Sequence, residues 1–203
     1  MKALRAGGLL LATVIALLWS HAAFAQETTT DPTTTDQTTT TTTTNKAPDP
    51  WAETATTRYL WQRATWFKVT ARRLSNLMRR DAPQLHRTRA EFHSLLAYRR
   101  WLRHAWRTKA ARARYGAKHP PHLAEWLCLH RWEGAWRDPN APYYGGLQMD
   151  LTFQRTYAAA LLRRKGTADH WAPFEQMWVA ERALRAGRGF YPWPLTARRC
   201  GLI

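Results

Sequence analysis

The chain has 203 residues, and its 31 Lys and Arg outnumber its 14 Asp and Glu to give a formal charge of +17. A charge of this sign and size favours polyanionic partners over neutral or basic ones. No nucleotide or redox-cofactor motif occurs, and only one short N-terminal run is strongly apolar, which argues against cofactor-dependent enzymes and multi-span membrane proteins.

The first 25 residues have the pattern of a secretory signal peptide. Lys2 and Arg5 precede an apolar run, Leu9–Leu18, and a small-residue cleavage site that ends at Ala25. The run is short for a membrane span, although an uncleaved anchor is the alternative interpretation. We therefore expect a secreted chain that begins near Gln26.

Residues 26–50 are dominated by threonine and contain almost no large apolar side chains. Such a segment cannot offset the entropy lost on ordering. The sequence predicts a disordered linker here.

Two apolar runs with helical spacing occupy residues 51–118, and arginines are interleaved with both. Between them, Asp81 is a natural N-cap and Pro83 is tolerated in a first helical turn, so the second helix is expected to begin there. His119-Pro120-Pro121 cannot continue it. The pattern predicts a basic helical hairpin with two long arms.

The hairpin has few acidic residues to balance its arginines. A signal peptide argues against nucleic acid as the partner, although Lys and Arg would suit phosphates. The alternative binding partners of residues 57–115 are anionic wall polymers or an anionic membrane surface. A purely structural role, in which the Trp and Leu stripe packs on the next domain, is equally compatible with the pattern.

Residues 126–149 place one carboxylate, Glu133, at the end of a predicted helix that Gly134 terminates. The negative end of the helix dipole and the flanking Trp132 and Trp136 favour the protonated acid. Cleavage of a glycosidic bond requires such an acid. The alternative is a surface Glu at a fraying helix end.

A turn at Asp138–Pro142 leads into Tyr143–Gly146, which could form a short hairpin. The glycines permit close approach of the backbone to a ligand, and the Gln148 amide offers a donor and an acceptor. Asp150 is a good N-cap for the next helix. Asp138 and Asp150 are also the only nearby candidates for a second catalytic carboxylate.

Two more helices are predicted around 153–162 and 173–184, followed by an aromatic, proline-rich tail around Trp193. The tail either packs near Cys200 or forms a stacking platform for sugar rings. No metal site is predicted, because His104, His119, His122 and His130 lack ligand spacing.

Three motifs together resemble a known family. The first is Cys128 with Trp132–Trp136 and the second is Tyr143–Gln148. The third is the tail, with Glu175–Gln176, Val179–Arg182 and Trp193–Leu202. All three resemble the actinobacterial transglycosylase-like domain of resuscitation-promoting factors. The resemblance covers about residues 122–203.

The resemblance implies a lysozyme-like fold and a single general acid/base, Glu133, acting on peptidoglycan without a cofactor. It also implies a substrate cleft. We take its candidate substrate-binding residues to be Trp136, Tyr143, Tyr144, Gly145, Gly146, Gln148 and Asp150.

The chain departs from the family pattern at two points. The family places its Cys directly before the catalytic Glu, whereas Cys128 lies about one helical turn earlier and stays on the same helix face. The loop from Glu133 to Trp136 is shorter by two residues. Two Cys in an exported chain predict one disulfide, Cys128–Cys200, with two free thiols as the alternative.

The expected fold class is α+β, mostly α, with a small lysozyme-like domain over 119–203 preceded by the basic hairpin over 51–118. The expected function is a secreted, cell-wall-associated lytic transglycosylase or muramidase acting on peptidoglycan glycan strands. Two alternatives remain open: a non-catalytic wall-binding protein, and a cationic membrane-active protein acting through residues 57–115.

Overall fold

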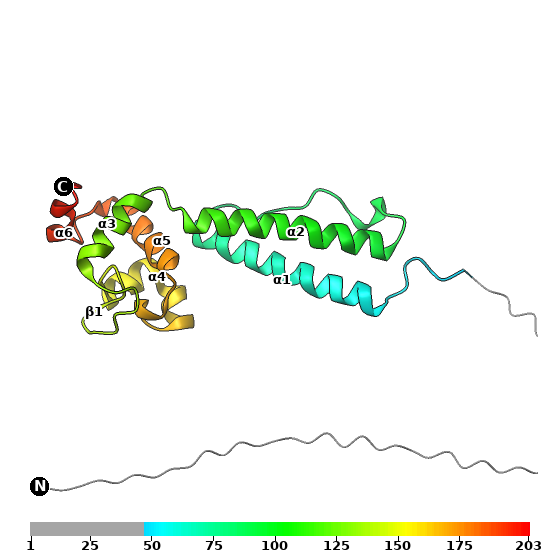
Figure 1. Ribbon diagram of the computed structural model, residues 1–203, viewed down its shortest axis with the longest axis horizontal. Helices are drawn as coiled ribbons and strands as arrows, with labels where there is room; N and C mark the ends of the chain where they lie inside the picture. The colour runs from blue at the N-terminus through cyan, green and yellow to red at the C-terminus, as the bar shows by residue number, and fades with distance from the viewer. Residues whose placement is uncertain (1–46) are drawn as a thin grey trace, which may run out of the picture. The chain divides into compact units, whose positions relative to one another are not determined.

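The computed structural model describes residues 47–203 (Figure 1). The predicted signal peptide and most of the predicted linker lie outside the described residues. The fold class is confirmed: the described chain is mostly helical, with one two-stranded sheet.

The first two helices, α1 (Ala55–Leu77) and α2 (Leu95–Lys118), lie side by side over their length (Figure 1). At their starts, the Arg99 guanidinium donates to both carboxylate oxygens of Glu53 at 2.9 Å, and the Leu95 N–H donates to the Pro50 carbonyl. At their ends, Leu77 and Ala117 share one core cluster. The helices are therefore parallel, and the prediction of a hairpin is wrong.

The second helix begins 13 residues later than predicted, because Ser94 rather than Asp81 is its N-cap. The Ser94 hydroxyl accepts from the Ala97 N–H at 3.2 Å. The segment between the helices is extended apart from one 3₁₀ turn, η1 (Arg89–Glu91). It returns alongside the pair and packs Leu85 onto the core between the helices, so this leucine is partly buried without helical periodicity.

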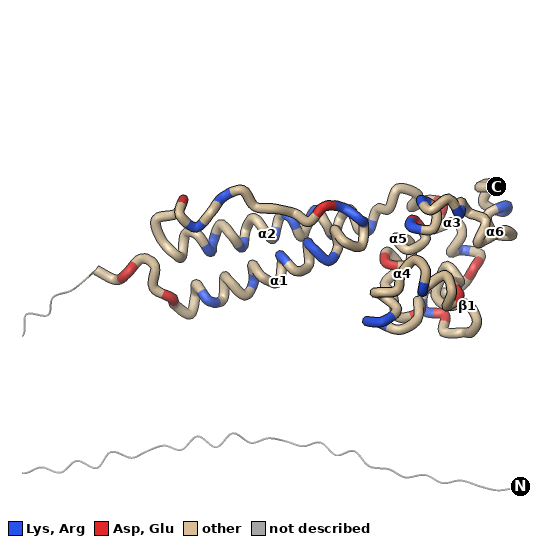
Figure 2. The backbone as a smooth tube through the Cα atoms, turned by 180° about the vertical axis from the view of Figure 1, so that it is seen from behind, with Lys and Arg blue, Asp and Glu red and all other residues tan. Residues whose placement is uncertain are grey.

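Small residues set the spacing of this pair. Ala64 and Ala71 of α1 and Ala110 of α2 are almost fully buried, beside Phe67 and Trp106. Alanine at a contact lets two helices approach closely, and the large rings fill the space between the alanines. Lys and Arg recur along both helices (Figure 2).

The remaining chain forms a set of short helices and one small sheet. Its elements are α3 (Leu123–Glu133), β1 (Tyr143–Tyr144), β2 (Met149–Asp150), α4 (Leu151–Lys165), η2 (Ala168–His170), α5 (Pro173–Ala183), a π turn η3 (Leu184–Arg188) and α6 (Pro194–Arg199). The strands are antiparallel, with Tyr143 opposite Asp150. The sheet and α3 to α5 match the prediction within a few residues, whereas α6 was not predicted.

One core joins the helix pair to these later helices. The buried Trp178 of α5 donates from Nε1 to the Ala117 carbonyl at 2.8 Å, and Arg182 donates to the Leu77 carbonyl at 3.0 Å. Both acceptors lie in the last turns of their helices, where carbonyls lack intrahelical partners. The ends of α1 and α2 are thus tied to α5 by hydrogen bonds as well as by packing.

No helix within residues 47–203 is long and apolar enough to cross a membrane.

Candidate active site

Glu133 is the last residue of α3, and Gly134 ends the helix as predicted. Its side chain is half-buried and faces a cavity of about 270 Å³. The other residues that line this cavity are Tyr143, Gln148, Pro192, Trp193, Pro194 and Leu195. Of the described residues around the cavity, only Glu133 has a carboxylate.

A hydroxyl from α6 holds this carboxylate. Thr196 Oγ1 donates to Glu133 Oε1 at 2.5 Å. Thr196 Oγ1 also lies 3.3 Å from the Trp193 carbonyl oxygen. Sequence reasoning missed Thr196. The available signal was its position one helical turn before Cys200, because a bridge to α3 brings that turn close to Glu133.

Tyr143 and Gln148 are the two predicted substrate-binding residues that line the cavity. Tyr143 is half exposed. Gln148 Nε2 donates to Asp138 Oδ2 at 2.9 Å and to the Gly145 carbonyl at 3.0 Å. Both amide protons are therefore used within the loop, and within residues 47–203 no group donates to Gln148 Oε1. That oxygen is an available acceptor for a ligand hydroxyl.

The two glycines of this loop are buried rather than facing the cavity. A Cβ on Gly145 would lie 2.6 Å from Gln176 Oε1, and one on Gly146 would lie 2.6 Å from His130 Nδ1. Trp136 stacks on the His130 ring with centroids 3.9 Å apart. Close packing inside the protein therefore explains the glycines, and neither they nor Trp136 line the cavity.

Tyr144 and Asp150 also lie outside the lining of the cavity. Tyr144 is partly buried against the core. Asp150 caps α4 as predicted, accepting from the Phe153 N–H at 2.6 Å.

Asp138 has a structural role in the turn before the sheet. Its carboxylate accepts from the Asn140 N–H at 3.1 Å and from the Gln148 amide. These hydrogen bonds, first from the Asn140 backbone and then from Gln148, lower the pKa of Asp138. Asp138 thus orients Gln148, and neither Asp138 nor Asp150 lies among the lining residues as a second carboxylate.

Gln176 of α5 belongs to the motif in the tail, but the sequence indicated no role for it. It is fully buried. Its Oε1 accepts from the Gly146 N–H at 2.9 Å, and its Nε2 donates to the Trp136 and Ala168 carbonyls at 2.8 and 2.9 Å. One side chain therefore satisfies several buried backbone groups and fixes the Tyr-Tyr-Gly-Gly loop beside α5.

The disulfide Cys128–Cys200 is confirmed and joins α3 to the end of α6. Trp193, just before α6, is almost fully buried and donates from Nε1 to the Leu147 carbonyl at 2.6 Å. The tail therefore packs back near the disulfide, as the first interpretation of it predicted. Within residues 47–203 no group of three or more His, Cys, Asp or Glu is placed to hold a metal ion.

Comparison with known proteins identified no relative of this chain. No protein-family model matches it, and neither does any curated protein or solved structure.

Proposed function

We propose that this chain is a secreted peptidoglycan-cleaving enzyme in which Glu133 is the general acid and base. The observation that supports this most directly is the single carboxylate in a cavity lined by Tyr143, Gln148 and the Pro-rich tail. A half-buried carboxyl beside polar side chains suits proton transfer to a glycosidic oxygen. The motif resemblance points to the same residue.

One carboxylate is sufficient if the substrate supplies its own nucleophile. Glu133 donates its proton to the leaving oxygen as the bond from that oxygen to the anomeric carbon breaks. The ionised Glu133 then accepts the proton of the 6-hydroxyl of the same sugar, whose oxygen bonds to the anomeric carbon. The product carries a 1,6-anhydro ring, which defines a lytic transglycosylase.

Thr196 suits both protonation states of Glu133. A hydroxyl donates to the carboxylate at 2.5 Å, the arrangement described above. When Glu133 carries the proton, the acid can donate to Thr196 Oγ1, and the hydroxyl proton can turn toward the Trp193 carbonyl 3.3 Å away. The carboxyl group then keeps its position through the proton cycle.

Digestion of purified peptidoglycan tests the proposal. The chain from Gln26 onward and its Glu133→Gln variant are incubated with the substrate, and the products are analysed by mass. Anhydro products from the unmodified chain only support a transglycosylase, and reducing ends from it only support a muramidase. Glu125→Gln, on the same helix but outside the cavity, is the matched control and should keep full activity.

The second candidate is a non-catalytic protein that binds cell walls. It is favoured by the engagement of both further carboxylates, Asp138 and Asp150, in hydrogen bonds within the protein. This candidate predicts wall binding without products from either the unmodified chain or Glu133→Gln.

A further inference from the structure

The parallel arrangement of α1 and α2 creates a groove of about 360 Å³ that lies outside the cavity of Glu133. Trp61, Lys68 and Arg72 line it from α1, at intervals that place them on one helix face. Tyr98 and Trp106 line it from α2. Arg87, from the segment between the two helices, lines the third side of the groove.

The aromatic side chains give this groove an apolar floor and one accessible ring. Trp106 is only 5% exposed and lies at the bottom, whereas Trp61 is 47% exposed. Lys68 Nζ and the Arg72 guanidinium carbon lie 5.9 and 6.0 Å from the Trp106 ring centroid. Cation–π contacts at these distances hold both cations over the groove.

The positive charge of the groove is not neutralised from within. None of the described residues that line it is Asp or Glu. Arg87 forms an ion pair with Glu91 at 3.1 Å, but Lys68 and Arg72 form none within residues 47–203. A concave site with two unpaired cations has a focused positive potential.

We propose that this groove binds a sugar that carries an anionic group, as repeated along a phosphate-, sulfate- or carboxylate-bearing glycan. Lys68 and Arg72 would bind the anion by charge-assisted hydrogen bonds. The Trp61 ring provides an apolar surface for the C–H face of a sugar ring. The site is independent of Glu133 and of the proposed cleavage reaction.

A membrane surface fits the same helices less well. A helix that lies in a bilayer interface must turn its apolar face toward the acyl chains. Here the apolar faces of α1 and α2 pack on each other through Ala64, Phe67 and Leu102. Of the two Trp rings in the groove, Trp106 is also buried too deeply to reach acyl chains.

Direct binding of matched polymers tests this proposal. Dextran sulfate and dextran share a glucan backbone and differ in charge, while linear polyphosphate has charge without sugar. We expect the chain from Gln26 onward to bind dextran sulfate at physiological salt, to bind polyphosphate more weakly, and not to bind dextran. Phosphatidylglycerol vesicles provide the membrane comparison.

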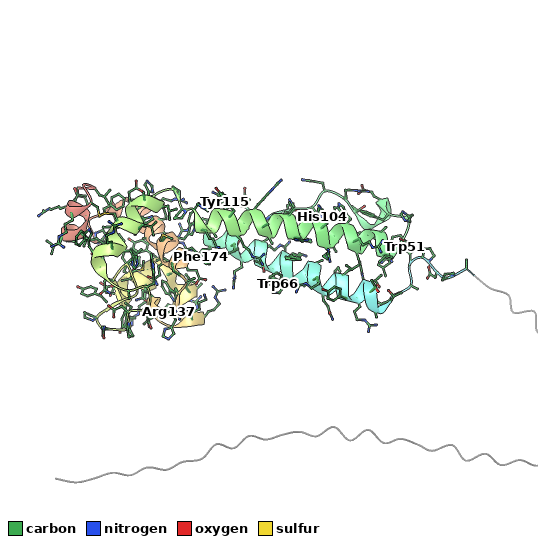
Figure 3. The ribbon with its side chains drawn as sticks, in the orientation of Figure 1. Trp51, Trp66, His104, Tyr115, Arg137 and Phe174 are labelled. Atoms are coloured by element: carbon green, nitrogen blue, oxygen red, sulfur yellow. A yellow bond between two sulfur atoms is a disulfide. The ribbon has the colours of Figure 1, made fainter. Side chains whose placement is uncertain are left out.

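Matched variants locate the site. Lys68→Gln with Arg72→Gln should weaken binding of dextran sulfate roughly tenfold, whereas Arg100→Gln with Arg107→Gln, an equal loss of charge elsewhere on α2, should change it about twofold. Trp61→Ala should weaken binding of dextran sulfate roughly fivefold. Trp66 also lies on α1 (Figure 3) and is 49% exposed, but it does not line this groove, so Trp66→Ala should leave the binding unchanged. Circular dichroism verifies the fold of each variant.

Three results would overturn the proposal. Equal losses from the two charge variants would mean that binding is spread over the whole basic surface. Polyphosphate binding as tight as that of dextran sulfate, with the same dependence on Trp61, would remove the role of the sugar. Vesicle binding that depends on Lys68, Arg72 and Trp61 would assign the groove to a membrane instead.

Discussion

Thr196 Oγ1 donates to Glu133 Oε1 across the contact between α6 and α3, at 2.5 Å. The disulfide Cys128–Cys200 crosses the same contact about one helical turn away on each helix. The covalent link fixes the two helices, and the hydroxyl fixes the carboxylate between them. Stability and the geometry of the proposed catalytic group therefore depend on the same pair of short helices.

Thr196→Val should separate these two roles. Valine has nearly the shape of threonine but cannot donate or accept a hydrogen bond, so Glu133 loses its partner. Under the proposed function we expect kcat for peptidoglycan cleavage to fall roughly tenfold or more, with KM nearly unchanged. Thr196→Ser keeps the hydroxyl and should restore most of the activity.

A merely structural role for Thr196 would give another pattern. Thermal unfolding would then account for the loss, and Thr196→Ser and Thr196→Val would differ in Tm but not in kcat below it. Equal kcat for both variants in folded protein would contradict the positioning role.

Gly145→Ala tests whether this loop position is set by internal packing. Gly145 has φ +73°, and a Cβ there would lie 2.6 Å from Gln176 Oε1. Gly187 has a similar φ of +83° but nothing within 4 Å of an added Cβ. Backbone strain should cost about 1 kcal/mol at both positions, and overlap should add about 1–3 kcal/mol at Gly145 only.

Urea unfolding of Gly145→Ala and Gly187→Ala measures this difference directly. Equal destabilisation would mean that Gln176 moves aside freely, and would reopen the interpretation that Gly145 is needed for a ligand.

Local signals in the sequence predicted the elements well. Apolar spacing located the helices, Asp150 was recognised as an N-cap and Gly134 as a helix end, because these signals act over one or two turns. The direction of α2 was not predictable in the same way. Asp81 with Pro83 is as good a local start as Ser94, and only the packing of the partly buried Leu85 on the core of the helix pair favours the extended return.

The candidate site shows the same limit. Glu133, Tyr143 and Gln148 were identified because they lie near one another in the sequence, and the structure places them around one cavity. Thr196 contacts Glu133 from 63 residues away in the sequence, and Gln176 contacts Gly146 from 30 residues away. No local pattern could indicate these contacts. Burial of Gly145 depends on Gln176 and was missed for that reason.

Glu181→Ala should destabilise the protein strongly. The Glu181 side chain is fully buried and accepts from the His122 N–H at 3.0 Å and from Trp126 Nε1 at 2.9 Å. Truncation leaves the buried Trp126 Nε1–H and the part-buried His122 N–H without a partner and opens a cavity. We expect a loss of about 3 kcal/mol in the free energy of unfolding.

Glu125→Ala is the control for Glu181→Ala, because Glu125 lies in the first turn of α3 and forms no ion pair within residues 47–203. It should change the free energy of unfolding by less than about 1 kcal/mol. Similar losses for both variants in urea unfolding would mean that water reaches the donors once Glu181 is removed.

The lowered pKa of Asp138 should make the folded chain less stable in acid than at neutral pH. Hydrogen bonds from the Asn140 N–H and the Gln148 amide lower its pKa in the folded chain. A lowered folded pKa gives stability that is fully present above the ordinary Asp pKa of about 4 and is lost as pH falls through the folded value. Asp138→Asn should flatten the fall in stability below about pH 4.

Carboxyl NMR titration checks the cause. The Asp138 signal should titrate below the usual Asp range, and Gln148→Ala should move it part of the way back. A normal pKa for Asp138 in the unmodified chain would mean that the turn is not held by this carboxylate.

Removal of the disulfide should lower stability more than any single surface substitution. Cys128 and Cys200 are 72 residues apart in the sequence, and the chain-entropy argument gives about 4 kcal/mol for a loop of that size. The double variant Cys128→Ser and Cys200→Ser should therefore show a lower urea midpoint than the oxidised chain, and should match the chemically reduced chain. Thiol titration of the unreduced, denatured chain should detect no free Cys, whereas two reactive thiols would show that the bridge does not form in solution. If the reduced chain kept its full stability, the link between α3 and α6 would depend on the Glu133–Thr196 hydrogen bond and on packing alone.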